Sequence, residues 1–195
     1  MESLKNFFNK QETFMYGCDE KNRMLHLNSM PVDLLKEIKL STANAAVKAE
    51  SDLNHDKWSK DQLLNANIGR GNKWMSDHLP ECWLEINFKG DTHTVAGIGF
   101  VTADDCPYRD PKKITIQYKD EEGSWVDSKT LEPEGKPEPR KVRELFPPGR
   151  NKLKKFNIPA CKTTAFKFLL SHDGNHENFA FAQIQFYGDP DACDT

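Results

Sequence analysis

Short segments in which apolar and polar residues alternate constrain the fold of this chain more than any other feature. In 83–88, the side chains of Leu84, Ile86 and Phe88 fall on one face of an extended strand, because successive side chains of a strand point to opposite faces. Strands of similar character are expected at 114–119, 154–158, 165–170 and 180–187. The short apolar run 95–101 contains two glycines and indicates a buried strand with close neighbours. Turn residues separate these segments, so the pattern predicts an all-β domain, either an antiparallel sandwich or a barrel.

The N-terminal part of the chain differs from the rest. Pro31 suits the first turn of a helix, and Leu34, Leu35 and Ile38 follow it at helical spacing, so a helix is predicted within 31–38. The apolar residues before Pro31 have no clear period. The expected organisation is a partly helical N-terminal extension at 1–40, which packs on the domain or on a partner, a β domain at 41–190 and a tail at 191–195.

Two connecting segments have the character of loops. Residues 103–111 lie between two expected strands and contain three aspartates and two prolines. Residues 131–149 contain five prolines, which cannot continue the interior of a sheet. We expect the second segment to be mobile.

The charge of the chain limits its partners. The formal net charge is −3, whereas broad nucleic-acid binding is accompanied by a basic excess, so no nucleic-acid partner is expected. Apolar runs are only a few residues long, far below the roughly 20 needed to cross a bilayer, so no membrane insertion is expected. Residues 140–155 are locally basic. Arg140, Lys141 and Arg143 are candidates for docking an anionic protein partner, and an ordinary solvated loop is the alternative.

Cysteine usage and the N-terminal residues favour a reducing compartment. The chain has five cysteines, an odd number, with no Cys-x-x-Cys pair and no Asn-x-Ser/Thr acceptor for glycosylation. The first eight residues are interrupted by polar side chains and do not resemble a secretory signal. We therefore expect a cytoplasmic or other intracellular location.

Several motifs follow one another in a set order from residue 63 onward. They are Leu63-Leu64-Asn65-Ala66-Asn67, Trp74-Met75-Ser76, Glu81-Cys82-Trp83-Leu84-Glu85-Ile86-Asn87-Phe88, Val95-Ala96-Gly97-Ile98-Gly99-Phe100, Ile114-Thr115-Ile116-Gln117-Tyr118 and Phe181-Ala182-Gln183-Ile184-Gln185-Phe186-Tyr187-Gly188. This ordered set resembles the discoidin, or coagulation factor 5/8 type C, family of the galactose-binding-like superfamily. The match covers roughly residues 41–188.

The resemblance implies an antiparallel jelly-roll β-sandwich of about eight strands, with ligand-binding loops at one end. It also implies that the domain is not catalytic, as in most members of the family. The superfamily includes intracellular protein-docking modules as well as lectins. Since unrelated functions are found on one fold, the ligand has to be argued from the residues of the site.

Members of this family often hold a structural calcium ion through an aspartate before the tryptophan, nearby carbonyls and a glutamate on the last strand. The matching positions here carry Asn65, Asn67, Asn72 and Gln183. Calcium prefers several hard oxygen ligands with carboxylate charge, and these neutral amides supply none. We expect no cofactor, with calcium at these four residues as a weaker alternative to amides that hydrogen-bond within loops.

The resemblance also indicates which loops could bind a ligand. Carbohydrate sites combine an aromatic platform with hydrogen-bonding side chains. The candidates with these chemistries are Trp58, Tyr108, Arg109, Asp110, Asn175 and His176. Polar side chains are also common in any surface loop, which is the alternative interpretation.

Catalysis is not expected. A nucleophile needs a base within hydrogen-bond reach, and the chain has no Gly-x-Ser-x-Gly, phosphate-loop or His-Glu-x-x-His motif. His172 and His176 lie four residues apart, but the glycine and asparagine between them predict a loop, and no complete zinc pattern occurs. Two hypotheses remain ahead of a third, weaker one, an enzyme accessory domain or hydrolase. The first is an intracellular protein-interaction module, and the second is a lectin-like carbohydrate-binding domain that uses the loop end of the sandwich.

Overall fold

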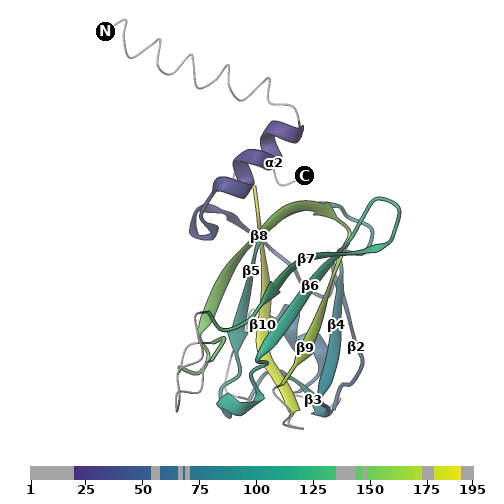
Figure 1. The fold of residues 1–195 in the computed structure, drawn as a ribbon. Coiled ribbons are helices and arrows are strands. Elements are labelled where there is room, and N and C mark those ends of the chain that lie inside the picture. The colour runs from purple at the N-terminus through teal and green to yellow at the C-terminus, as the bar shows by residue number, and fades with distance from the viewer. Residues whose placement is uncertain are drawn as a thin grey trace, which may run out of the picture.

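The computed structural model describes residues 20–53, 58–65, 68, 71–134, 144–146, 149–172 and 178–189. Within these residues, ten strands form two antiparallel sheets that pack face to face (Figure 1). The expected all-β class and jelly-roll β-sandwich are confirmed, with ten strands in place of the eight or so expected.

The first sheet has the strand order β1-β10-β5-β8, and β3 also pairs with β10. Its strands are β1 (Lys36–Ile38), β3 (Trp74–His78), β5 (His93–Thr102), β8 (Leu153–Thr163) and β10 (Asn178–Gly188). β1 and β3 share one edge of β10, because Ile38 lies opposite Phe186 and Trp74 lies opposite Phe181. The other edge of β10 pairs with β5.

The second sheet has the strand order β2-β4-β9-β6-β7. Its strands are β2 (Ala46–Ala49), β4 (Glu81–Asn87), β6 (Lys113–Lys119), β7 (Trp125–Leu131) and β9 (Ala165–Ser171). Phe168 of the central β9 lies opposite Leu84 on one side and Ile116 on the other, and all three are fully buried. The alternation in the sequence therefore becomes one apolar face of this sheet.

Aromatic side chains fill the space between the two sheets. The rings of Phe100 in β5 and Phe168 in β9 are 5.5 Å apart between centroids, and those of Phe88 and Phe186 are 5.4 Å apart in an edge-to-face arrangement. Fully burying a large apolar side chain contributes about 1.5–3 kcal/mol, so these rings are a main source of stability. They fix the two sheets on each other and leave the connections free to vary.

The N-terminal segment packs on the outer side of the first sheet. It consists of α2 (Glu20–Ser29), the single 3-10 turn η1 (Val32–Leu34) and β1. Leu27, Val32 and Leu35 form a second apolar cluster with Ala96 and Tyr187 of the sheet. Residues 36–38, expected within the extension, are thus a strand of the sandwich itself.

The predicted helix over 31–38 is wrong. Pro31 precedes a short 3-10 turn, and the chain then extends to pair with the edge of β10. The helical spacing of Leu34, Leu35 and Ile38 is lost because Leu34 points to solvent while Leu35 is buried. Hydrogen bonds to a free strand edge outweigh a weak local helical preference.

The two ends of the sandwich carry different elements. α2 lies at the end where β8 and β10 finish (Figure 1). The short 3-10 helices η2 (Lys60–Leu64) and η3 (Pro107–Arg109) belong to connections at the other end, near β3. No helix in the described ranges is long and apolar enough to span a bilayer.

Candidate ligand-binding site

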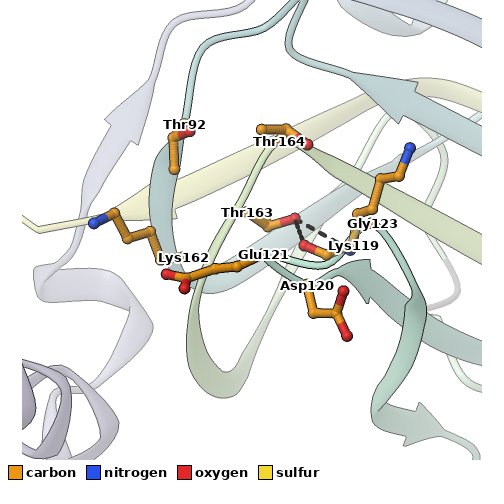
Figure 2. A pocket seen from close by; sticks show the side chains of 8 residues that line it. All are labelled: Thr92, Lys119, Asp120, Glu121, Gly123, Lys162, Thr163 and Thr164. Carbon is orange, nitrogen blue, oxygen red and sulfur yellow. Dashed lines mark hydrogen bonds between the residues drawn. The ribbon is translucent and has the colours of Figure 1, made fainter.

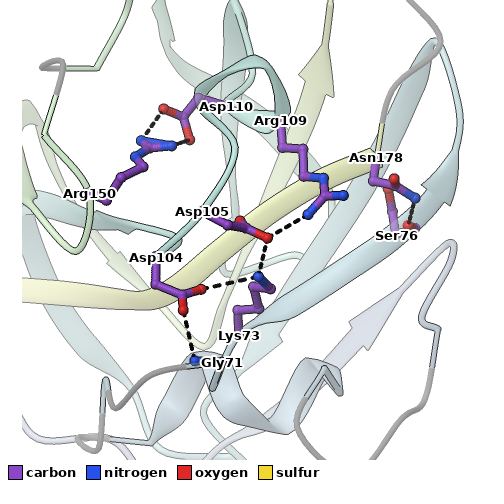
Figure 3. Close-up of polar contacts among 9 residues, drawn as sticks. All are labelled: Gly71, Lys73, Ser76, Asp104, Asp105, Arg109, Asp110, Arg150 and Asn178. Atoms are coloured by element: carbon purple, nitrogen blue, oxygen red, sulfur yellow. Dashed lines mark hydrogen bonds and ion pairs between the residues drawn. The ribbon is translucent and has the colours of Figure 1, made fainter.

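Three connections meet at the end of the sandwich remote from α2. They are the described parts of the connection before β3 (50–53, 58–65, 68 and 71–73), the segment 103–112 between β5 and β6, and the segment 149–152 before β8. In the second of these, Pro107 occupies the first turn of η3, where its missing N–H costs nothing. The next residue, Tyr108, is exposed, whereas the Arg109 side chain is mostly buried. Figure 3 shows the charged side chains that join these connections, and we call this region the loop end.

Lys73 is the centre of this charged group. Its side chain is buried, and its ammonium lies 3.1 Å from Asp104 Oδ1 and 2.5 Å from Asp105 Oδ2 (Figure 3). The second oxygen of Asp104 accepts the backbone N–H of Gly71 at 2.9 Å. The 103–112 connection is therefore tied to the residues that enter β3 by three charge-assisted contacts.

Asp105 links Lys73 to Arg109. The guanidinium of Arg109 donates to Asp105 Oδ2 at 2.6 Å. Burial opposes the ionisation of Asp105, but hydrogen bonds from Lys73 and from the Cys106 N–H, together with the charges of Lys73 and Arg109, outweigh it and hold the pKa of Asp105 below its usual value. Asp105 is therefore a carboxylate that accepts hydrogen bonds and orients Arg109.

Asp110 forms a second ion pair in this region. Arg150 contacts both of its carboxylate oxygens, at 3.2 and 2.5 Å (Figure 3). Burial raises the pKa of Asp110 to about 7, although the charges of Arg150 and Lys112 oppose the rise. Asp110 is thus a buried anchor between two connections, and it is not a freely presented hydrogen-bonding group.

The aromatic candidates differ in accessibility. Tyr108 is 52% exposed, and the Arg109 guanidinium lies 5.9 Å from its ring centroid. Trp58 is half-buried against Met75 and Ala180, and the Lys73 ammonium lies 6.0 Å from its ring centroid. Tyr108 can therefore present an aromatic face to a ligand, whereas Trp58 packs on the first sheet beside the Lys73 ammonium.

Four of the six predicted ligand-binding residues come together in the structure. Trp58, Arg109 and Tyr108 are connected through Lys73 and Asp105 at the loop end, and Asp110 lies in the same connection but is paired separately with Arg150. The other two, Asn175 and His176, lie outside the described residues. The role of all six residues in binding a ligand stays a prediction.

Several residues of this site were missed from the sequence. They are Lys73, Asp104, Asp105 and Arg150. The signal that was available is the acidic pair Asp104-Asp105 in a polar loop, since neighbouring carboxylates near a sheet need a cation. Nothing in the linear sequence identifies which cation that is.

The proposed calcium residues do not fit a calcium ion. The amide oxygen of Gln183 accepts from the Gln185 amide at 2.9 Å, and the Asn65 amide faces Gln62 at 3.4 Å. These residues and Asn72 supply no carboxylate, and Asn67 lies outside the described residues. No cluster of three or more His, Cys, Asp or Glu able to hold a metal occurs in the described ranges.

The basic stretch is only partly described. Arg140, Lys141 and Arg143, the predicted docking residues, lie outside the described residues. Three of the described cations of this stretch have partners within the fold: Arg150 binds Asp110, Lys154 donates to the Leu145 carbonyl at 2.6 Å, and Lys155 lies 3.2 Å from Asp33.

A separate depression of about 340 Å³ lies at the opposite end of the sandwich (Figure 2). Its lining residues are Thr92, Lys119, Asp120, Glu121, Gly123, Lys162, Thr163 and Thr164. The Thr163 hydroxyl is already bonded to both backbone polar groups of Lys119 (Figure 2). None of the lining side chains is aromatic, so this depression lacks the platform that the loop end has.

No protein-family model matches the chain, and no curated protein sequence matches it. Solved structures do match. A CBM32 module from Clostridium perfringens, in complex with GalNAc-β-1,3-galactose, has a TM-score of 0.58 and 9% identity, and the match covers 78% of this chain and all (100%) of that module. The family 32 carbohydrate-binding module of NanJ from the same bacterium, in complex with galactose, has a TM-score of 0.56 and 14% identity over 78% of this chain and 99% of that one.

A fucolectin from striped bass (Morone saxatilis) serum matches as well. Its TM-score is 0.54 at 12% identity, over 74% of this chain and 47% of that one. The chain has the galactose-binding-like β-sandwich fold. The expected resemblance to discoidin-type domains is confirmed at the level of the fold. At such low identity the ligand of this galactose-binding-like sandwich has to be argued from its own loop end.

Proposed function

We propose that this chain is a non-catalytic module that binds neutral glycans at the loop end. The observation that carries the proposal is the exposed ring of Tyr108 beside the Arg109–Asp105 pair. Sugar rings present an apolar face that packs on an aromatic ring, and a rim of hydroxyls that both donate and accept hydrogen bonds. A guanidinium with a neighbouring carboxylate offers donors and acceptors for such a rim.

The balance of charge at the loop end supports a neutral ligand. Lys73, Arg109 and Arg150 are each paired with an aspartate in the structure. An anionic ligand would have to displace a carboxylate from one of these cations, and leaving a buried charge unpaired is costly. A neutral glycan can bind without displacing any of these carboxylates.

Two atoms of the group have unused hydrogen-bonding capacity. Asp105 Oδ1 and Arg109 Nε are buried and have no hydrogen-bond partner among the described residues. One accepts and the other donates, so a single hydroxyl group that reaches them on a small movement of the loop would satisfy both. A sugar supplies several hydroxyl groups of this kind.

The structural neighbours support this function over protein docking. Two of them are complexes with galactose or GalNAc-β-1,3-galactose, so the lectin-like alternative from the sequence is favoured over the intracellular protein-interaction module. The predicted docking residues Arg140, Lys141 and Arg143 and the predicted intracellular location stay predictions. Localisation of the tagged full-length chain in its native cells tests the latter.

A glycan array followed by calorimetry tests the proposed function. The array should include galactose-terminated, GalNAc-terminated and chitosan-type glycans together with sialylated and sulfated ones. We expect binding to neutral members, and Tyr108→Ala should lower the affinity by about tenfold, which corresponds to about 1.4 kcal/mol.

The matched control is Leu34→Ala, which truncates another exposed apolar residue (64% exposed) at a distance from the loop end. It should leave glycan affinity unchanged. Silence of the wild-type chain across the array, or a preference for anionic glycans that survives Tyr108→Ala, would exclude the proposed function.

A further inference from the structure

We propose that Lys73 is the positioning residue of the loop end, a built-in cation that holds the 103–112 connection in its glycan-binding conformation, so that binding needs no metal ion. This inference rests on the proposed function, because the conformation matters only if Tyr108 and Arg109 contact a ligand. It assigns to one lysine the task of bringing two connections together.

The position of Lys73 suits this task. Lys73 directly precedes β3, whose first residue, Trp74, is fully buried, so the backbone at Lys73 is anchored to the first sheet. Its side chain is 5% exposed and extends toward the neighbouring connection, where it meets two consecutive carboxylates (Figure 3). Long lysine side chains are almost never fully buried unless they are paired in this way.

The contacts form a chain that ends at the ligand-contacting residues. The ammonium binds Asp105 at 2.5 Å, and the same oxygen of Asp105 accepts from Arg109 at 2.6 Å. Arg109 in turn lies beside the exposed ring of Tyr108. Asp104 joins the same two connections a second time, since it binds both the Lys73 ammonium and the Gly71 N–H. Movement of Lys73 therefore affects the orientation of Arg109 without any contact between Lys73 and the ligand.

The same contacts explain why the ammonium can take the place of a metal ion. Two carboxylates that lie side by side repel one another and need a cation between them. Here Lys73 supplies it from within the chain, and Arg109 adds a second positive charge to Asp105. A divalent cation would have to displace the ammonium from a buried position to reach these oxygens.

Loss of the ammonium should open the connection without unfolding the sandwich. Asp104 and Asp105 are 18% and 33% exposed at their side chains, so both carboxylates can turn to water once their cation is gone. The contacts of Lys73 lie between connections, outside the aromatic layer that joins the two sheets. The effect is therefore expected in the loop and in ligand affinity more than in global stability.

Lys73→Met, which keeps the length of the side chain and removes its charge, is the central variant. The probes are galactose and GalNAc-β-1,3-galactose, titrated by calorimetry in EDTA and again in calcium. We expect at least tenfold weaker binding for Lys73→Met, and recovery of part of the affinity in Lys73→Arg, which restores a positive charge. The wild-type affinity should be the same in EDTA and in calcium.

A readout that needs no ligand accompanies the titrations. Amide hydrogen exchange at Gly71 should become at least tenfold faster in Lys73→Met, because the Asp104 carboxylate that accepts this N–H loses its second anchor. Lys155→Met is the matched control: the Lys155 side chain is 26% exposed and, like that of Lys73, is paired with an aspartate of another segment, but this partner is Asp33 of the N-terminal segment. It should change neither Gly71 exchange nor glycan affinity.

The outcomes separate this inference from the proposed function. Suppose that the wild-type chain binds neither probe, while Gly71 exchange is still faster in Lys73→Met. The proposed function then fails. The contacts of Lys73 with Asp104 and Asp105 would anchor the loop only, and their role in positioning a ligand would be overturned. Unchanged Gly71 exchange and unchanged affinity in Lys73→Met would show that Lys73 does not hold the 103–112 connection. A requirement for calcium in the wild-type chain would overturn the proposal that binding needs no metal ion. If Lys73→Met fails to fold, Asp104→Asn weakens the same contacts from their more exposed side and is judged by the same two measurements.

Discussion

Two opposing effects, burial and nearby positive charge, act on the pKa of Asp110. Burial raises its pKa to about 7, with smaller contributions in the same direction from Glu144 and Asp105, while Arg150 and Lys112 favour the charged form. The contact with Arg150 is therefore a full ion pair only above neutral pH. Below it, the protonated carboxyl can still accept a hydrogen bond from Arg150 through its carbonyl oxygen, so the two connections remain joined.

The first stability prediction follows from this pKa. An unfolded aspartate titrates near about 4, so between roughly pH 4 and 7 the folded state holds a proton that the unfolded state lacks. The contribution of Asp110 to the free energy of unfolding is therefore present at low pH and falls as the pH rises through this window, by at most about 1.4 kcal/mol per pH unit. Asp110→Asn should remove this dependence.

Urea unfolding of both proteins from pH 5 to pH 8 measures the effect. As the pH rises to about 7, the unfolding free energy of the wild type should fall steadily relative to that of Asp110→Asn. Above this pH the difference between the two proteins should level off. Asp127→Asn, at an exposed carboxylate paired with Gln117 on the outer face of the second sheet, serves as the control. A pH-independent difference for Asp110→Asn would contradict the assignment.

At the scale of elements, the N-terminal segment is an integral part of the sandwich. The side-chain amide of Asn157 in β8 accepts from the Val32 N–H at 3.1 Å and donates to the Met30 carbonyl at 2.7 Å. These two hydrogen bonds fix η1 over the first sheet. Gly97 in β5 makes the close approach possible, because a Cβ atom there would lie 2.5 Å from Val32 Cγ2.

Gly97→Ala should therefore destabilise the protein by forcing η1 away from β5. Overpacking of this kind costs about 1–3 kcal/mol. Because the clash involves the Val32 side chain, the cost of Gly97→Ala should be smaller in a Val32→Ala background. Denaturant unfolding of the wild type, the two single variants and the double variant forms a complete cycle. Strict additivity of the two changes would show that Val32 is not the obstacle.

At the scale of the whole molecule, the two ends of the sandwich have separate tasks. α2 and the β8–β9 turn lie at one end, and the charged group that holds Tyr108 and Arg109 lies at the other (Figure 1, Figure 3). The buried apolar layer between the sheets separates these two ends. Packing of the N-terminal segment and ligand binding are therefore expected to vary independently.

The overall charge gives a prediction at this scale. The net charge is −3, and Lys73, Arg109 and Arg150 at the loop end are already paired with aspartates, so long-range attraction contributes little to binding a neutral glycan. Raising sodium chloride from 50 to 500 mM should change the glycan dissociation constant by less than about threefold. Calorimetry at the two salt concentrations measures it. A decline in affinity of tenfold or more would favour an anionic partner and the basic stretch as its docking surface.

The amino-acid sequence by itself determined the fold class. Alternation at Leu84, Ile86 and Phe88 assigned one face of a strand to the interior, and that face is buried in the structure. A period of two is a local property, so it can be read without knowledge of the partner strands. The same local pattern located six of the ten strands, whereas β1, β2, β3 and β7 were not predicted. The closing aromatic and glycine of β10 were recognised from the family resemblance.

The composition of the site was decided only by the tertiary structure. Lys73 meets Asp104 and Asp105 across 31 and 32 residues of chain, and Arg150 meets Asp110 across 40. Periodicity states which face a side chain occupies, but not which connections converge at the end of a sandwich. The segment 31–38 shows the same limit. Its apolar residues have helical spacing, but residues 36–38 form a strand because they pair with an edge of β10 that lies some 150 residues further along the chain. Local pattern follows from covalent neighbours, whereas ion pairs between loops depend on how the whole chain closes.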